Sequence, residues 1–142
     1  MNQNVTVGID IGGTNTKIGV AALNGKILVS SSIQTTRYPK IEAFIAALDK
    51  EIHQLLNQSG DVQLTAIGIG APNGNYLKGT IEQAPNLPWK GVVPFCELLS
   101  KYFTVPVVLT NDAKAAALGE MIYGGAKGMK NFITITLGTG VG

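Results

Sequence analysis

The chain has 142 residues, the size of one ordinary domain, and its 45% hydrophobic and 14% charged residues predict a folded α/β core and exclude a disordered chain. Its formal net charge of +2 comes from scattered lysines without a basic stripe, so nucleic acid is not an expected partner. The single cysteine, Cys96, excludes an internal disulfide and favours a half-buried structural thiol, and without an export leader or a long apolar stretch we expect a cytoplasmic protein with no membrane span.

Three strand-like segments open the chain, at residues 5–12, 16–23 and 27–35. The sequence "NGK" separates the second from the third and is a strong hairpin signal, because Asn and Gly accept positive φ. These segments predict a three-stranded meander. Residues 39–58 follow, with their apolar side chains on one helical face and Gly60 just beyond, which predicts an amphipathic helix packed on the sheet.

The second half of the chain alternates short apolar runs with helical patterns. It is expected to contain a buried strand at 64–70, a loop at 71–92, a helix at 93–103, a buried strand at 105–110, the start of a helix at 111–125 and a last strand at 132–142. The predicted order is therefore βββαβαβα plus one further strand, which places the chain in the α/β class.

The stretch "DIGGTNTK" at residues 10–17 is a candidate phosphate-binding turn. Glycines let backbone N–H groups approach an anion closely, and Thr14, Thr16 and Lys17 add donors. The alternative is that the two glycines only close a hairpin. Turn chemistry alone does not call for an acid such as Asp10 just before the turn, which favours the phosphate interpretation.

The sequence "ITITLGTG" near the end of the chain repeats this pattern of an apolar strand that runs into a Gly and Thr turn. Two such turns facing each other could clamp a polyphosphate. The competing interpretation is two unrelated glycine turns. An uncovered last strand would also leave an unprotected sheet edge, which proteins usually avoid.

Five motifs in order, "DIGGTNTK", "GIGAPNG", "APNLPWKG", "TNDAKAAALGE" and "TLGTGVG", closely resemble the N-terminal half of ROK-family sugar kinases, bacterial glucokinases in particular. The resemblance implies the ribonuclease H-like fold of the actin, hexokinase and heat-shock chaperone superfamily, in which two lobes close on ATP, Mg²⁺ and a sugar. Residues 1–130 would be the N-terminal lobe, and residues 131–142 the first strand and phosphate turn of a second lobe that is otherwise absent here. A homo-oligomer of the full-length protein is compatible with this resemblance.

The resemblance implies ATP-dependent phosphorylation of a hexose, with glucose as the first candidate. N-acetylmannosamine or fructose remains an alternative substrate. A sugar-sensing regulator and a nucleotide-binding module without catalysis remain alternative functions, although the first phosphate strand begins too early to leave room for a DNA-binding domain before it. We expect the isolated lobe to be inactive, because catalysis in a cleft needs donors on both walls and the exclusion of water.

The resemblance also implies roles for individual residues. The nucleotide would be held by Asp10, Gly12, Gly13, Thr14, Lys17, Gly138, Thr139 and Gly140. Asp10 would orient Mg²⁺, most readily through water, because this ion keeps much of its hydration. The sugar would be held by Gly70, Gly74, Asn86, Asn111 and Asp112, although "APNG" and "APNL" are also ordinary turn sequences.

Asp112 is the candidate general base, because it stands where a buried strand ends and a helix begins. Helix capping is the competing interpretation, since Asp is among the favoured capping residues. Lys114 stands where the family usually carries Asn, and whether it touches a phosphate or alters the base is open. Trp89 is expected to be a packing anchor and His53 a surface residue, and nothing in the chain predicts zinc.

Overall fold

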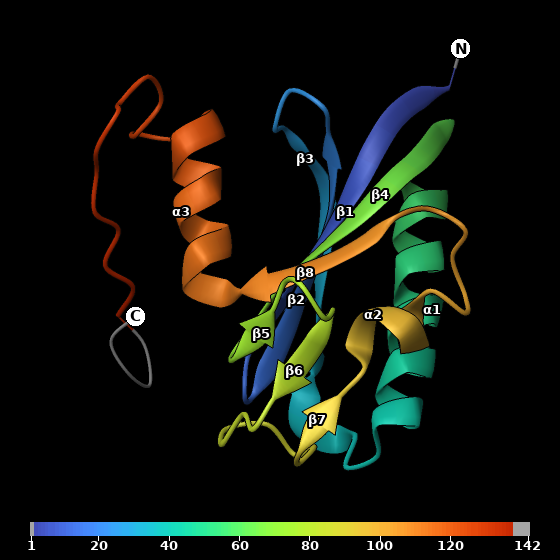
Figure 1. Ribbon diagram of the computed structural model, residues 1–142. Helices are drawn as coiled ribbons and strands as arrows, with labels where there is room; N and C mark the ends of the chain where they lie inside the picture. Colours follow the sequence, from blue (N-terminus) through green and yellow to red (C-terminus); the bar gives the residue numbers. More distant parts are fainter. Residues whose placement is uncertain (1, 138–142) are drawn as a thin grey trace.

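The computed structural model describes residues 2–137 and is built around one five-stranded sheet, in the order β3-β2-β1-β4-β8 (Figure 1). Its strands are β1 Gln3–Ile11, β2 Asn15–Ala22, β3 Ile27–Gln34, β4 Val62–Ala71 and β8 Val107–Asn111. β1, β2 and β3 pair antiparallel, whereas β4 pairs parallel with both β1 and β8. The carboxyl ends of β1, β4 and β8 therefore meet at one edge of the sheet, where ligands bind in open α/β sheets.

The predicted three-stranded meander is confirmed. Alternate residues of β1 and β2 are buried, as the two-residue period of a strand requires. The turn between β2 and β3 places Gly25 at a φ of +87°, and the Asn24 Oδ1 accepts a hydrogen bond from the Lys26 N–H at 3.1 Å. Gly25 thus takes the positive φ expected of this turn, whereas Asn24 does not and contributes through its side-chain hydrogen bond.

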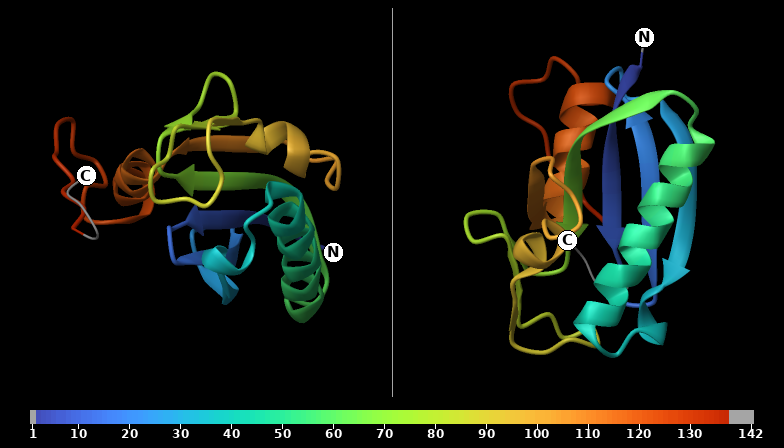
Figure 2. Two further views of the ribbon diagram at one scale, coloured as in Figure 1. Left: turned by 90° about the horizontal axis from the view of Figure 1, so that it is seen from below. Right: turned by 90° about the vertical axis from the view of Figure 1, so that its right-hand side faces the viewer.

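The predicted amphipathic helix is α1, Ile41–Gln58, which begins two residues after Pro39. Its apolar side chains, Phe44, Ile45, Leu48, Ile52 and Leu55, are buried in the core against one face of the sheet. Figure 2 shows α1 and the short α2, Phe95–Leu99, on this face and α3, Asp112–Tyr123, on the opposite one. No helix of residues 2–137 has the length and apolar character needed to cross a bilayer.

The segment predicted as a loop, 71–92, instead contains most of a second, three-stranded sheet. Its strands are β5 Gly74–Asn75, β6 Thr80–Glu82 and β7 Val92–Val93, in that order across the sheet. Strands of two or three residues are too short to show a period, so only their tertiary pairing reveals them.

Trp89 anchors the chain between β6 and β7. Its Nε1 donates a hydrogen bond to the Tyr38 carbonyl at 3.0 Å, and its ring centroid lies 4.5 Å from that of Phe44. The predicted packing role of Trp89 is confirmed.

The helix predicted over 93–103 is limited to α2, Phe95–Leu99. Tight turns follow, with the Tyr102 N–H donating to the Leu99 carbonyl at 3.0 Å. They bring the Phe103 ring against His53 of α1, with the ring centroids 5.2 Å apart. Phe103 is buried at the end of these turns, which a continued helix was not expected to produce.

In the part that the structure describes, the last predicted strand is reduced to an isolated bridge at Leu137. Residues 132–136 pair with no strand of residues 2–137, and Ile133 and Leu137 are 89% and 80% exposed. A strand needs a neighbour for its backbone N–H and C=O groups, and this segment lies beside none. Residues 138–142 lie outside the described residues, and the division into two lobes at residue 131 stays a prediction.

Candidate functional site

The sheet register brings Asp10 close to the start of α3. Asp10 is the partner of Gly70 in the β1–β4 pairing, and Gly70 is the partner of Thr110 in the β4–β8 pairing. A Cβ at Gly70 would lie 3.2 Å from the Ala115 Cβ and 3.4 Å from the Asp112 Cα. Glycine at this position therefore lets the first turn of α3 rest directly on the sheet beside Asp10.

The sequence left open whether Asp112 caps α3 or is available as a base, and the structure shows which of the two neighbours, Asn111 or Asp112, is the cap. Asn111 is the N-cap of α3, and its Oδ1 accepts a hydrogen bond from the Lys114 N–H at 3.3 Å. Asp112 is half-buried, and one of its oxygens accepts a hydrogen bond from the Ala113 N–H at 2.9 Å. Within the described residues, the other Asp112 oxygen and the Asn111 amide nitrogen have no partner. The cap position therefore belongs to Asn111, and Asp112 keeps an oxygen for other chemistry.

The candidate phosphate turn is closed by the Gly12 N–H, which donates to the Asn15 carbonyl at 3.0 Å. A Cβ at Gly12 would lie 2.6 Å from that same carbonyl oxygen, so the turn requires glycine there. Gly12 was expected to offer its N–H to a phosphate, but this N–H is used inside the turn. The Gly13 and Thr14 N–H groups donate to no acceptor within residues 2–137 and are the donors that remain.

Two other predicted donors differ in their placement. Lys17 is exposed and stands across from Asp10 in the β1–β2 pairing, on the same face of the sheet. Thr16, in contrast, is fully buried and hydrogen-bonded to Thr35, so the expectation that it adds a donor around a phosphate is wrong. Its position in the two-residue period of β2 turns its side chain toward the core.

The turn touches a second predicted segment through Gly13. A Cβ at Gly13 would lie 2.7 Å from the Asn86 carbonyl oxygen, which places these two backbones in direct contact. Asn86 itself is exposed. The candidate phosphate turn and the candidate sugar loop therefore adjoin each other at the same end of the sheet.

The loop that contains Gly74 lies directly against the end of β8. A Cβ there would collide with the Thr110 carbonyl, so only glycine allows this approach. Next to it lies an open hollow of about 600 Å³. The hollow is lined by Asn73, Gly74, Asn75, Tyr76, Leu77, Glu82, Thr110, Asn111 and Lys114.

Glu82 was missed by the sequence analysis, which treated its segment as a loop. Its carboxylate accepts hydrogen bonds from the Thr80 Oγ1 at 2.8 Å and the Asn75 Nδ2 at 3.2 Å. The bond from Thr80, aided by the Lys78 ammonium 3.5 Å away, holds the pKa of Glu82 below its usual value despite some desolvation. The hollow thus has a fixed acid in its lining, with the exposed Lys114 also lining it.

Asp10 is the residue that could hold Mg²⁺. It is exposed, and its carboxylate forms no hydrogen bond or ion pair within the described residues. Mg²⁺ with a nucleotide needs only one or two protein carboxylates besides water and phosphate oxygens. A lone, accessible carboxylate beside the phosphate turn fits that requirement, and no cluster of three metal-ligating side chains occurs in residues 2–137.

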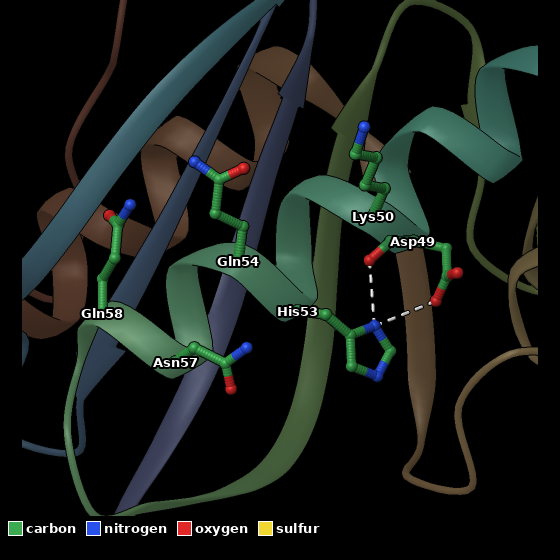
Figure 3. A pocket seen from close by; sticks show the side chains of 6 residues that line it. All are labelled: Asp49, Lys50, His53, Gln54, Asn57 and Gln58. Carbon is green, nitrogen blue, oxygen red and sulfur yellow. Dashed lines mark hydrogen bonds and ion pairs between the residues drawn. The ribbon is translucent and has the colours of Figure 1, made fainter.

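A second hollow, of about 570 Å³, lies on the outer surface of α1 and contains none of the motif residues (Figure 3). All six lining side chains come from α1. His53 is exposed there, and its Nδ1 lies 3.0 Å from the Asp49 Oδ1. This hollow is the polar face of one helix, in agreement with the surface role predicted for His53.

Cys96 is half-buried, and burial raises the pKa of its thiol. A raised pKa lowers the thiolate fraction at neutral pH, as expected for a structural cysteine. Gly138, Thr139 and Gly140, the predicted second phosphate turn, lie outside the described residues.

Comparison with known proteins identifies the family to which the chain belongs. A family model described as ROK family matches residues 6–142. The chain is 39% identical over 139 residues to a glucokinase of Streptomyces coelicolor, covering 97% of this chain and 42% of the relative. It is 38% identical over 147 aligned positions to a glucokinase of Halalkalibacterium halodurans, covering 100% of this chain and 44% of that protein.

Among solved structures, a ROK family glucokinase from Streptomyces griseus in complex with glucose and AMPPNP is similar with a TM-score of 0.83 and 36% identity. The match covers 97% of this chain and 43% of that one. The chain thus spans less than half the length of each of these three proteins.

Proposed function

The chain belongs to the ROK family, and on that premise we propose that it is the N-terminal lobe of an ATP-dependent hexose kinase, with glucose as the substrate. Its five-stranded sheet and flanking helices have the actin-like ATPase fold of the ROK sugar kinases. The observation that carries the proposal is the meeting of Asp10, Gly70 and Asp112 at one sheet edge, beside a turn with two N–H donors that have no acceptor within residues 2–137.

The turn supplies the nucleotide contacts. The Gly13 and Thr14 N–H groups, which have no acceptor in the described part of the chain, would bind phosphate oxygens, and Lys17 adds a positive charge on the Asp10 face of the sheet. Asp10 would hold the hydrated Mg²⁺, which neutralises the charge that develops on the phosphates during transfer. Phosphoryl transfer depends mostly on such positioning and charge neutralisation.

Asp112 acts as the base in this proposal. Its second oxygen accepts the proton of the sugar hydroxyl while that hydroxyl oxygen bonds to the terminal phosphorus of ATP. The bond between this phosphorus and the bridging oxygen breaks, and ADP leaves. Asn111 donates its amide hydrogens to a neighbouring sugar hydroxyl, because its Oδ1 is engaged at the helix cap.

The sugar would enter between Asp112 and the loops that contain Gly74 and Asn86. Gly74 brings one loop onto the end of β8, and Gly13 brings the other against the phosphate turn. These contacts support a sugar position adjacent to the terminal phosphate. The relatives are more than twice as long as this chain, and the opposite wall of the cleft would come from the remainder of the protein.

The test is the substitution Asp112→Asn in the complete protein. We expect kcat for glucose phosphorylation to fall at least about a hundredfold, the usual contribution of a general base, with glucose binding nearly unchanged. Turnover is measured by coupling glucose 6-phosphate to NADP⁺ reduction, with fructose and N-acetylmannosamine as competing substrates in an ADP-release assay.

Asp61→Asn, an exposed carboxylate in the turn between α1 and β4, is the matched control and should leave kcat unchanged. Near-normal turnover in Asp112→Asn would reduce Asp112 to a structural residue. No ATP-dependent turnover of any hexose by the complete wild-type protein would overturn the kinase proposal itself.

A further inference from the structure

Two hydroxyl groups are sealed in the core behind the phosphate turn. Thr16 of β2 and Thr35, the residue just after β3, both have no solvent exposure, and their Oγ1 atoms lie 2.8 Å apart. A buried hydroxyl is costly unless it is hydrogen-bonded, so this pair needs a structural or functional reason. The mechanism proposed above uses neither residue.

The direction of these hydrogen bonds follows from proton counting. The Thr35 Oγ1 donates its only proton to the Gly12 carbonyl at 2.8 Å. The Thr16 hydroxyl must therefore donate to the Thr35 Oγ1. The Thr35 N–H also donates to the Thr14 carbonyl at 2.9 Å. Thr35 thus holds the carbonyls on both sides of Gly13.

The held carbonyl determines where the Gly13 N–H points. The described peptide bonds are trans, and in a trans peptide the C=O of one residue and the N–H of the next point in opposite directions. The Gly12 carbonyl points inward to a buried hydroxyl, so the Gly13 N–H points outward. This N–H has no acceptor within residues 2–137.

We propose that Thr35, supported by Thr16, is a positioning residue that locks the Gly12–Gly13 peptide so that the Gly13 N–H faces the phosphates of the bound nucleotide. Two adjacent glycines can rotate their shared peptide easily, and the rotated form would present a carbonyl oxygen to the anion. The Thr35 hydroxyl removes that alternative. This inference rests on the proposed nucleotide function of the turn.

The experiment compares Thr35→Val with Thr35→Ser in the complete protein. Valine keeps the shape and loses the hydroxyl, whereas serine keeps the hydroxyl. Calorimetric titration with AMPPNP measures the nucleotide Kd, and a separate titration with glucose measures the sugar Kd. We expect Thr35→Val to raise the AMPPNP Kd about tenfold, the worth of one well-placed hydrogen bond, and the glucose Kd less than about twofold. Thr35→Ser should restore AMPPNP binding to within about twofold of wild type.

Thr16→Val separates positioning from simple loss of stability. Thr16→Val removes one buried hydrogen bond and Thr35→Val removes two, so the midpoint of thermal unfolding should fall in both variants, and further in Thr35→Val. Only Thr35→Val releases the Gly12 carbonyl, so only this variant should weaken AMPPNP binding strongly. The ¹⁵N–¹H signal of Gly13 in the nucleotide-free protein should likewise move more in Thr35→Val than in Thr16→Val.

An unchanged AMPPNP Kd in folded Thr35→Val, or an equal loss in both valine variants, would overturn the positioning role. If Thr35→Val does not fold, Thr35→Ala provides the same comparison without the hydroxyl. If the wild-type protein itself does not bind AMPPNP, the proposed nucleotide function fails first, which distinguishes the two ideas.

Discussion

Gly70 offers a sharp test of the geometry at the sheet edge. In Gly70→Ala the new methyl group would lie 3.2 Å from the Ala115 Cβ, whereas ordinary contacts of this kind are 3.4–4 Å. The first turn of α3 must therefore move away from the sheet by a few tenths of an ångström, and Asp112 moves with it. A misplacement of about 1 Å can cost about a hundredfold in rate, so we expect kcat to fall about three- to tenfold.

The effect on stability should be small by comparison. Slight overpacking of this kind costs about 1 kcal/mol of unfolding free energy, at the low end of the range for added core groups. The measurements are kcat at saturating ATP and glucose in the complete protein, and the free energy of unfolding from urea titration.

Gly68→Ala is the matched control, because Gly68 lies two residues earlier on the same strand and face, and a Cβ there meets no atom of residues 2–137 within 4 Å. This variant should retain wild-type kcat, with stability unchanged or slightly raised. Equal kcat values for Gly70→Ala and Gly68→Ala would refute the argument that the close approach of α3 at Gly70 positions Asp112.

Two further predictions concern other parts of the lobe. Gly13→Ala should weaken both nucleotide and glucose binding in separate titrations, because its Cβ would lie 2.7 Å from the Asn86 carbonyl oxygen and must displace that loop. Loss of nucleotide binding alone would show that the two segments act independently. Cys96 should react with iodoacetamide at pH 8 more slowly than a free peptide thiol, because burial raises its pKa and lowers the thiolate fraction. The rate should increase as the pH rises further, and a rate equal to that of the peptide would contradict the buried placement.

The kinetic role of Asp112 also depends on which residue caps α3, and sequence reasoning left this question open. Asp and Asn are both good capping residues, and they stand next to each other at the end of β8. The backbone of Asn111 is extended, with φ −63° and ψ 142°, and its side chain accepts the Lys114 N–H. Asn111 is the cap because only the residue just before the first helical turn can act as one, and the tertiary structure determines that the helix begins at Asp112.

Local signals in the sequence determined the meander, α1 and the turn at Gly25. Each depends on residues only a few positions apart: the two-residue period of β1 and β2, the helical period of α1, and the tolerance of Gly25 for positive φ. The motifs of the ROK family were also legible in the sequence, because the backbone approaches they require restrict residue types at fixed spacings. A side chain at Gly12 or Gly74 would collide with a backbone carbonyl, and one at Gly70 would press against Ala115.

Tertiary structure alone decided the features that join distant segments. Thr16 and Thr35 are 19 positions apart, and nothing near either residue indicates that their hydroxyls meet behind Gly12. The contact of Gly13 with Asn86, the small sheet of β5, β6 and β7, and the unpaired state of residues 132–136 likewise depend on which backbone lies alongside. A periodic pattern states which face of an element is apolar, but hydrogen-bond partners are set only when the packed sheet brings separate strands and turns together.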